Sequence, residues 1–578
     1  CDLLIAVHAC KSFPSIGRFR REHPRRPLVV VLSGTDLYQD LKRGSEVTQS
    51  LTMATHIVVL QKQALEEIPQ KFRHKATVIY QSAELYGGLN GCWDYGPLGV
   101  EVKRNLKEFW WRRNVQERED IVGLDGSILT HQSVLTASGH VGGFSDPMCD
   151  CLLSKARLRA DKIEPQSGTA YHYTGAKESE WSVTRDFAVL LREGENKNRA
   201  RKTARQFYAQ FHPNKSLSPK ALELIGESTT EEKNTTRYNP ENGSLLTEAR
   251  EFNLMFKTQV GASSSEEDPN AVAYLRPETA QSIFTQFKNV LDTSRQKVPF
   301  GIAQIGKAFR NEINPRNFTF RSREFEQMEI EYFCRPEDGL RLTDEWLEDR
   351  LTFYNDIGLP REKLHVLDVP DGERAHYSKK TYDIEFDFPF GCQELEGVAY
   401  RTDYDLSKHQ EHSGRPLEYF DEATKEKFIP HVVEPSAGCD RTVLALLCEA
   451  FGEEEVTDAK GKSEVRTVMR LHPRVAPIKA AIFPLLKKNE EQVRISREIQ
   501  RSLERFMNVF YDQTGAVGRR YRRQDEVGTP FCITVDFETL GEETPDLKDT
   551  VTLRHRDSME QERIAISDLL PRLLEEIR

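Results

Sequence analysis

Arginine and glutamate residues alternate with apolar residues along one stretch in the middle of the chain. Phe309-Arg310-Asn311-Glu312 is followed, after a short gap, by Phe318–Glu331, which contains Arg321, Glu329 and Glu331. A guanidinium group can grip phosphate oxygens in a bidentate manner. A face that carries guanidinium and carboxylate groups could therefore bind a phosphorylated, charged ligand. The simpler interpretation is a set of cross-strand ion pairs on a solvated sheet face.

Two strands joined by a turn must position these side chains. Apolar alternation in both segments predicts an antiparallel pair, and Asn314-Pro315-Arg316-Asn317 between them is a turn signal. Successive side chains of a strand point to opposite faces. Arg310 and Glu312 are therefore expected to share one face, as are Glu329 and Glu331.

The chain divides into three pieces by its pattern. Residues 1–82 alternate short β-branched runs with helix-like stretches, which predicts a partial Rossmann-like α/β segment. Its strands are expected at 3–7, 28–32, 56–60 and 76–80, with helices at 15–23 and 63–72. Residues 83–472 form a longer mixed region with an exposed insertion at about 150–250. Residues 473–578 predict a small α/β domain, with strands at 478–483, 531–537 and 550–553 and helices over 490–510 and 558–578.

The composition excludes several classes of protein. Of 578 residues, 38% are hydrophobic and 30% are charged, which is typical of a globular chain. Apolar runs are shorter than the about 20 residues that a membrane-spanning helix needs. The net charge of −10 means that any RNA contact must use local basic patches. The ten cysteines include no Cys-x-x-Cys pair, which predicts a reducing compartment and no zinc ribbon.

The order of residues around Arg310 is specific. Phe-Arg-x-Glu, a loop, and Arg-x-x-x-Phe-x-x-x-Glu are similar to motif 2 of the class II aminoacyl-tRNA synthetases. Other segments resemble the dimeric glycyl-tRNA synthetases, in the same order, over residues 84–578. These segments are Tyr86–Gly99, Gly139–Pro147, Leu275–Gln281, Glu394–Gly397, Arg401–Asp405, Glu434–Arg441 and Gly518–Asp525. The resemblance implies an antiparallel-sheet catalytic core over 83–472 and an anticodon-binding domain over 473–578.

The resemblance also implies an activity, glycine–tRNA ligation, in which glycine is joined to ATP and then passed to tRNA(Gly). Both steps are displacements at charged centres, so they require positioning and charge neutralisation rather than a nucleophilic side chain. The implied catalytic residues are Arg310, Arg441 and Glu394, and Glu394 is also expected to reach Mg²⁺. The implied ATP-binding residues are Arg310, Asn311, Glu312, Phe320, Arg321, Phe325, Glu394, Leu395, Gly438 and Arg441.

Glycine offers a protein only an ammonium group and a carboxylate. Its pocket must bind the ammonium group firmly and leave no space beyond Cα. A missing methylene group costs only about 1–3 kcal/mol of binding, so alanine must be rejected by steric clash. The implied glycine-binding residues are Arg159, Glu278, Phe325, Gln327, Glu329, Arg401, Glu434 and Ser436. Each glutamate alone is typical of a surface acid, and only their joint pattern favours a pocket.

The family implies partners as well. The expected tRNA-binding residues are Arg519, Arg520, Arg522 and Arg523, for which a solvated charged face is the alternative. Val100, Val102, Leu106, Phe109 and Trp110 have helical spacing in the segment that forms the dimer interface in this family. The resemblance therefore implies a homodimer, for which a helix that faces the core of its own chain is the alternative. The expected location is the cytoplasm. Cys149-Asp150-Cys151 lacks the second cysteine pair of many relatives, so no structural zinc is expected.

The first 82 residues resemble part of the acceptor half of two-domain glycosyltransferases, through Asp2–Ala9, Ser33–Tyr38 and Val78–Ser82. The half that would bind a sugar nucleotide is missing from the pattern, which disfavours glycosyl transfer. Ser33–Asp36 is either a ligand-binding turn or a structural remnant. Two alternatives stay open: a glycosyltransferase, and a non-catalytic synthetase-like accessory protein that binds nucleic acid. The second is disfavoured because Arg310, Arg321 and Arg441 are all present.

Overall fold

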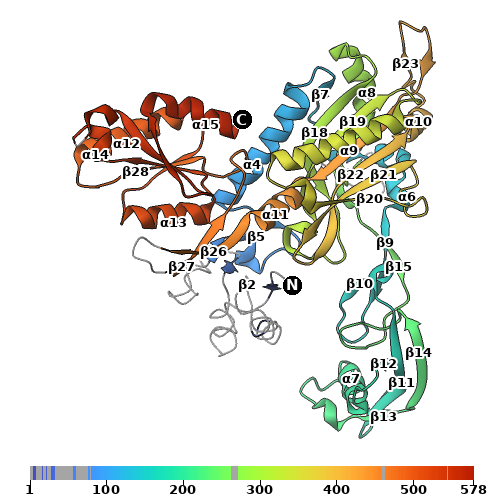
Figure 1. The fold of residues 1–578 in the computed structure, drawn as a ribbon. Helices are drawn as coiled ribbons and strands as arrows, with labels where there is room; N and C mark the ends of the chain where they lie inside the picture. The colour runs from blue at the N-terminus through green and yellow to red at the C-terminus, as the bar shows by residue number, and fades with distance from the viewer. Residues whose placement is uncertain are drawn as a thin grey trace. The chain divides into compact units, whose positions relative to one another are not determined.

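The computed structural model describes residues 80–261, 271–457, 463–542 and 544–578, with Ile16, Arg21 and the backbone of four short strands before residue 80. The chain folds into two compact units. The first comprises Cys1–Thr130, Glu278–Phe309 and Asn317–Arg578, and the second comprises His131–Pro277 and Arg310–Arg316. Figure 1 shows the course of the chain.

The first unit contains a seven-stranded sheet in the order β20-β21-β22-β25-β19-β18-β7, and Figure 1 labels all of these strands except β25. The strands are β20 (Leu364–Asp368), β21 (Lys380–Phe388), β22 (Gly391–Thr402), β25 (His431–Gly438), β19 (Glu324–Cys334), β18 (Phe300–Phe309) and β7 (Ile121–Gly123). The β18–β7 pair is parallel, and all other neighbours are antiparallel. The predicted antiparallel-sheet core is therefore confirmed.

The β18–β19 pair corrects one prediction about the chemistry-bearing residues. Glu329 and Glu331 do share one face of β19, and both are buried. Strand β18, however, ends at Phe309, so Arg310 and Glu312 lie beyond it. The backbone amide of Asn311 donates to the carbonyl of Leu254 in the second unit, instead of continuing the ladder with β19.

Helices pack on this sheet and complete its core. Helix α8 (Ala280–Ser294) lies against β18 and β19, and α9 (Gly339–Asp356) lies against β22 and β25. Helix α11 (Cys439–Ala450) directly follows β25, so it begins at the end of a central strand. Helix α10 (Tyr404–Ser413) follows β22. The ends of β22 and β25 thus lead straight into helices that carry the family motifs.

Helix α4 (Pro97–Trp111) begins with proline at its first position, where the missing N–H costs no hydrogen bond. Val102, Leu106 and Trp110 are buried in the core of the first unit, which supports the core-facing interpretation for them. Val100 is 46% exposed and is not part of that core. The helix therefore has one buried stripe and two apolar residues, Leu98 and Val100, left at the surface.

A buried ion-pair network ties α4 to β19 and α11. Lys103 Nζ lies 2.6 Å from Asp440 Oδ1 and 2.7 Å from Glu326 Oε2. The hydroxyl of Tyr95 donates to Asp440 Oδ1 at 2.8 Å, and the Glu326 amide donates to Asp440 Oδ2 at 2.8 Å. Asp440 immediately precedes Arg441, so this network fixes the first turn of α11.

This network predicts a pH-dependent stability. Burial by itself would raise the pKa of Glu326, but Lys103 and Lys107 lower it from 4.5 to about 2. Stability from Glu326 is therefore present above pH 4.5 and is lost as the pH falls towards 2. The Lys103→Met variant should unfold at lower denaturant concentration at pH 7 and lose less stability between these pH values.

The measurement is the denaturant midpoint of unfolding at a series of pH values. The matched control is Arg104→Met, which removes an exposed pair with Glu108 on the same helix and should change the midpoint little. Equal effects of the two substitutions would contradict the prediction.

The C-terminal part of the first unit contains a separate five-stranded sheet in the order β29-β28-β30-β31-β32. The strands are β28 (Ala480–Pro484), β29 (Val509–Tyr511), β30 (Phe531–Val535), β31 (Thr550–His555) and β32 (Gln561–Ala565). Three predicted strands are confirmed. The predicted helix over 490–510 is too long, because α12 (Glu490–Leu503) ends before β29. The predicted helix over 558–578 is partly wrong, because Gln561–Ala565 pairs with β31 and only α15 (Leu569–Ile577) is helical.

The second unit contains a long hairpin, β11 (Gln166–Glu178) and β12 (Trp181–Leu191), and helix α7 (Lys197–Ala209), which packs on β12 (Figure 1). The insertion expected at about 150–250 therefore contains regular strands and a helix. The rings of Phe187 and Phe207 stack with centroids 4.0 Å apart and help to hold α7 in place. The Cys151 thiol receives a hydrogen bond from the Ser154 amide at 3.5 Å.

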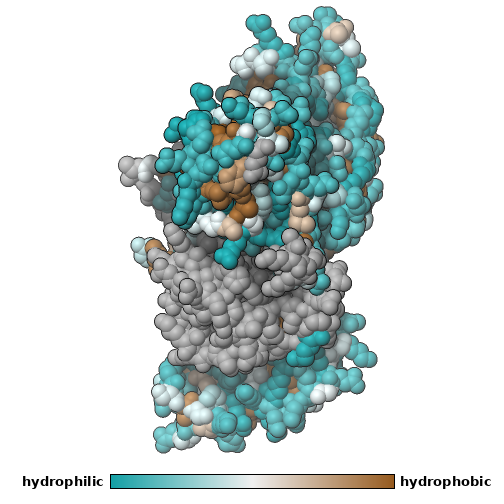
Figure 2. All heavy atoms as spheres, turned by 60° about the vertical axis from the view of Figure 1, so that its left-hand side comes forward, coloured by the Kyte–Doolittle hydropathy of each residue, from teal (hydrophilic) through white to brown (hydrophobic). Residues whose placement is uncertain are grey.

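Four short parallel strands lie at the N-terminus: β1 (Leu4–Val7), β2 (Leu28–Leu32), β3 (His56–Val59) and β4 (Ala76–Val78). They fall within the predicted strand positions. The predicted helix over 63–72, most of that over 15–23 and the turn at Ser33–Asp36 lie outside the described residues. No helix in the described part of the chain is both long and apolar enough to span a bilayer. Among the residues coloured by hydropathy in Figure 2, most are hydrophilic, and hydrophobic ones gather in one area of the upper half.

Candidate active site

Three adjacent strands of the large sheet bring carboxylates together. Glu329 lies on β19 and pairs in register with Ser436 of β25, while Glu434 of β25 pairs with Ala399 of β22. Both glutamates are buried. Glu278 precedes α8 and is only half-buried. The result is an acidic cluster with two buried members and one more accessible acid.

Hydrogen bonds hold Glu329 in a fixed orientation. The hydroxyl of Ser436 donates to Glu329 Oε1 at 2.7 Å, and the Thr279 hydroxyl donates to Glu329 Oε2. The amide of Gln327 lies 3.4 Å from both Glu329 Oε1 and the Ser436 hydroxyl. Burial raises the pKa of Glu329, and the neighbouring Glu278 raises it further. Such a carboxylate gains stability when a cation enters the pocket.

Arg401 supplies the guanidinium group of this acidic cluster. It donates two hydrogen bonds to Asp405, at 2.8 and 2.9 Å, and two to Glu434, at 2.8 and 3.0 Å. Its guanidinium carbon lies 3.9 Å from the centre of the Tyr377 ring. Burial raises the pKa of Glu434 even though Arg401 opposes this. Arg401 thus organises the pocket through Glu434.

A second group lies around Arg441 in the first turn of α11. Its guanidinium carbon is 4.4 Å from the centre of the Phe320 ring, and Nε donates to the Phe320 carbonyl at 3.2 Å. Nη1 lies 3.3 Å from Glu394 Oε2. An arginine stacked on an aromatic ring and paired with one carboxylate is well placed to exchange that partner for a phosphate.

Oxygen ligands of the kind that Mg²⁺ prefers gather beside Arg441. A Cβ placed on Gly397 would lie 3.9 Å from both Asp383 Oδ1 and Glu394 Oε1, so these two acids converge above that glycine. Burial raises the pKa of Asp383 to about 7, and Glu394 and Glu385 add to the rise while Arg441 opposes it. This donor set fits a hard divalent cation, which would be held by Glu394 and Asp383.

Four of the predicted site residues belong to the second unit: Arg159, Arg310, Asn311 and Glu312. Arg310 Nε donates to the Pro277 carbonyl at 3.1 Å, and its guanidinium carbon lies 5.4 Å from the Phe144 ring centre. Arg159 lies 2.8 Å from both Asp146 and Asp161. The remaining predicted residues of the ATP and glycine sites belong to the first unit.

Among those in the first unit, Leu395 is buried in the sheet core, so only its backbone could contact a nucleotide. Arg321 and Phe325 are half-buried. Gly438 ends β25, where a Cβ would lie 3.4 Å from Cγ of Arg441, and it therefore leaves room for the stem of that arginine.

The structure separates the four arginines predicted to bind tRNA. They lie on α13 (Val517–Val527), where Arg519 and Arg523 are exposed and Arg522 is half-buried. Arg520 is only 2% exposed and donates to the carbonyls of Pro484 and Leu485 at 2.7 and 3.2 Å. Its assignment to tRNA binding is corrected: Arg520 holds α13 to the end of β28.

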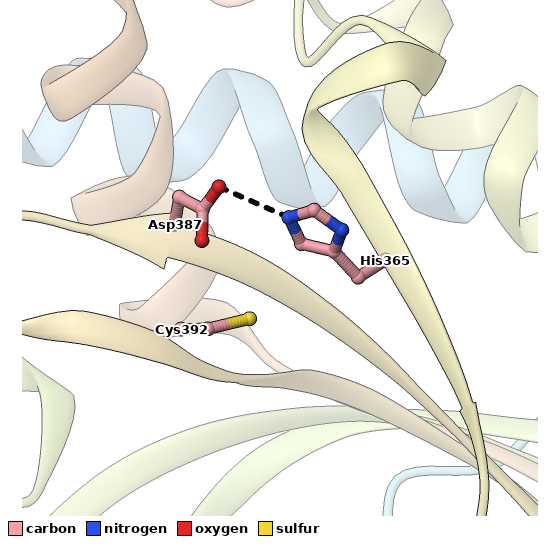
Figure 3. Close-up of side chains that lie close together, drawn as sticks. All are labelled: His365, Asp387 and Cys392. Carbon is pink, nitrogen blue, oxygen red and sulfur yellow. Dashed lines mark hydrogen bonds and ion pairs between the residues drawn. The ribbon is translucent and has the colours of Figure 1, made fainter.

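Figure 3 shows a further group of side chains, His365 of β20, Asp387 of β21 and Cys392 of β22, all exposed. His365 Nε2 lies 3.0 Å from Asp387 Oδ2, and the Cys392 thiol donates to Glu385 Oε2 at 3.7 Å. These groups therefore satisfy one another as an ion pair and a hydrogen bond on the surface of the sheet.

Comparisons with known proteins agree with this arrangement. Residues 258–450 match the model of the class II tRNA synthetase core domain (G, H, P, S and T), and residues 479–576 match the anticodon binding domain. A glycine–tRNA ligase from Clostridium perfringens is 48% identical over 491 residues, which are 85% of this chain and 94% of the relative. Those from Rhodopirellula baltica and Thermus thermophilus are each 46% identical, over 85% of this chain and 96% and 94% of their own lengths.

The sheet, the helix after its central strand and the matched domains define a class II aminoacyl-tRNA synthetase. Within that class, the extent of the identity is decisive. The chain belongs to the glycine–tRNA ligase family.

Sequence reasoning missed Asp383, which pairs in register with Gly397 and has its carboxylate near that of Glu394. It named Glu331, two residues after Glu329 on β19, but did not assign it to the glycine site. The Glu-x-Glu spacing of Glu329 and Glu331 places both on one face, and this signal was available in the sequence.

Proposed function

We propose that this chain activates glycine with ATP and transfers the glycyl group to the 3′ end of tRNA(Gly). The observation that carries the proposal is the acidic cluster of Glu278, Glu329 and Glu434. An ammonium group needs anionic acceptors, and three carboxylates held by neighbouring donors supply them. The carboxylate group of glycine is left to react.

The reaction requires ATP to be bent towards the amino acid, with the charge on its phosphates neutralised. From the family pattern, Arg310 would hold the α-phosphate in the transition state, and Arg441 would hold the γ-phosphate. Glu312 would contact the adenine amino group, Phe325 would stack on the ring, and Arg321 would lie along the triphosphate. Mg²⁺, held by Glu394 and Asp383, would neutralise further phosphate charge.

Selectivity for glycine would follow from the walls of the pocket. Gln327 and Ser436 fill the space around Glu329, and Arg401 fixes Glu434 from below. A Cβ on the substrate would have to displace groups that are already hydrogen-bonded. From the family pattern, Arg159 is also proposed to contact the substrate.

The experiment is ATP–pyrophosphate exchange with purified protein. Exchange that depends on glycine, and that alanine does not support, is expected. No exchange by a folded protein that binds tRNA would favour the accessory-protein alternative. Hydrolysis of a sugar nucleotide would instead favour the glycosyltransferase alternative. That alternative concerns residues 1–82, which contain the four-stranded sheet β1-β2-β3-β4.

We also propose that the protein is a homodimer in the cytoplasm. Apolar side chains in the first turn of α4 are exposed, Leu98 at 45% and Val100 at 46%. The cysteines of the described residues are free thiols, as expected of a reducing compartment. Sedimentation equilibrium should give twice the chain mass of 66.5 kDa, and Val100→Glu should shift the protein towards monomer.

The tRNA contact is proposed to use the outer face of α13. Replacing Arg519 and Arg523 together by glutamate should raise the KM for tRNA about 10-fold or more, because two phosphate contacts are reversed in sign. Glycine-dependent exchange should not change. The matched control replaces the exposed Lys487 and Lys488 of the same domain by glutamate, and an equal rise there would show that overall charge, rather than α13, is responsible.

A further inference from the structure

Glu331 is an anomaly in the acidic cluster. Its side chain is fully buried, and among the described residues neither of its carboxylate oxygens has a hydrogen-bond partner. A carboxylate oxygen of Glu331 nevertheless lies within 4.8 Å of one oxygen of Glu329 and one of Glu434. An ionised carboxylate in such a place would pay a desolvation cost with no donor to offset it.

The neighbouring cation, Arg401, is already engaged by other acids. Arg401 directs its hydrogen bonds to Asp405 and Glu434, which already present two acids to one guanidinium group. Glu329 receives its hydrogen bonds from the Ser436 and Thr279 hydroxyls, which carry no charge. A further negative charge at Glu331 would be uncompensated before any substrate arrives.

We propose that Glu331 is a neutral carboxylic acid that positions Glu329 and Glu434 to receive the ammonium group of glycine. Its single proton gives it one hydrogen bond to donate to a nearby carboxylate oxygen, and a neutral Glu331 adds no negative charge beside Glu329 and Glu434. Glu331 is thus a positioning residue beneath the pocket rather than a ligand of the substrate. This role rests on the proposed function of the pocket.

The electrostatic surroundings agree with this role. Burial raises the pKa of Glu331 well above its usual range, and Glu434, Glu329 and Asp405 raise it further, with Arg401 opposing them. The acids lie on β19, β25 and α10, and the arginine lies on β22. Acids on three different elements therefore favour the neutral form of Glu331.

Two substitutions distinguish whether Glu331 acts as a neutral acid or as an anion. Glu331→Gln keeps the size and the donor but cannot ionise, and it should leave the KM for glycine near the wild-type value. Glu331→Leu keeps the volume but removes the donor, and it should raise the KM for glycine about 10-fold or more in the exchange assay. The KM for ATP should not change in either variant. Difference infrared spectra should contain the carbonyl band of a protonated acid that is lost in Glu331→Gln.

The outcomes are distinct. If Glu331→Gln raises the KM for glycine as much as Glu331→Leu does, Glu331 acts as an anion and the proposal is wrong. If no protonated-acid band is lost in Glu331→Gln, the proposal is also wrong. Matching KM values for wild type and both variants would show that Glu331 has no positioning role. Absence of glycine-dependent exchange in the wild type itself would instead refute the proposed function.

Discussion

Arg310→Ala should lose glycine-dependent ATP–pyrophosphate exchange by on the order of 10³-fold or more, while it still binds tRNA. The reason is that charge develops on the α-phosphate in the transition state, and a guanidinium group that neutralises it acts most strongly there. Binding of ATP before the reaction should weaken much less than turnover.

Controls for this variant come from the same loop. Arg316 is exposed in residues 310–316, and Arg316→Ala should exchange at the wild-type rate. Arg310 also donates to the carbonyl of Pro277, so the thermal midpoint of both variants must be compared. Normal exchange with lost tRNA binding in Arg310→Ala would mean that the role of Arg310 has been misassigned.

The largest expected effect on stability is that of Arg401→Met. The substitution would leave Asp405 and Glu434 buried with no guanidinium partner, and removal of one member of a buried ion pair costs about 3–5 kcal/mol. Denaturant unfolding followed by intrinsic fluorescence should reveal an earlier transition. The KM for glycine should rise in parallel, since Glu434 loses the contact that orients it.

An exposed arginine gives the matched comparison. Arg341 on α9 pairs with Asp338 and Glu345 at the surface, and Arg341→Met should change the free energy of unfolding by less than about 1 kcal/mol. Adding Asp405→Asn to Arg401→Met should recover part of the loss, because it removes one of the unpaired charges. Equal stability of Arg401→Met and wild type would contradict the assigned network.

The sequence predicts those parts of the fold that local pattern decides. The antiparallel pairing of β18 with β19 and the shared face of Glu329 and Glu331 follow from a period of two. The end of β18 does not, because the backbone after Phe309 bonds to a distant segment. Residues 561–565 form a strand for a similar reason, since β31 supplies the partner.

The candidate site likewise has features that the local sequence predicts and features that depend on distant segments. Motif order is enough to name Glu278, Glu329, Glu434 and Ser436 as one group, and the structure brings them together in the first unit. Burial is harder to predict, because it depends on which face other elements cover. Arg520 illustrates this: four arginines in five residues look alike in the sequence, but only Arg520 shares its helix face with the buried Gln524.

The contact of Lys103 with Asp440 has a mechanical consequence. Asp440 receives bonds from residues 95, 103 and 326, so the start of α11 cannot shift without displacing α4 or β19. A displacement of α4 from its exposed side, where Val100 lies, would be transmitted to Arg441 through Lys103 and Asp440. A ligand or partner that moves α4 should therefore also move Arg441, even if it touches no residue of α11.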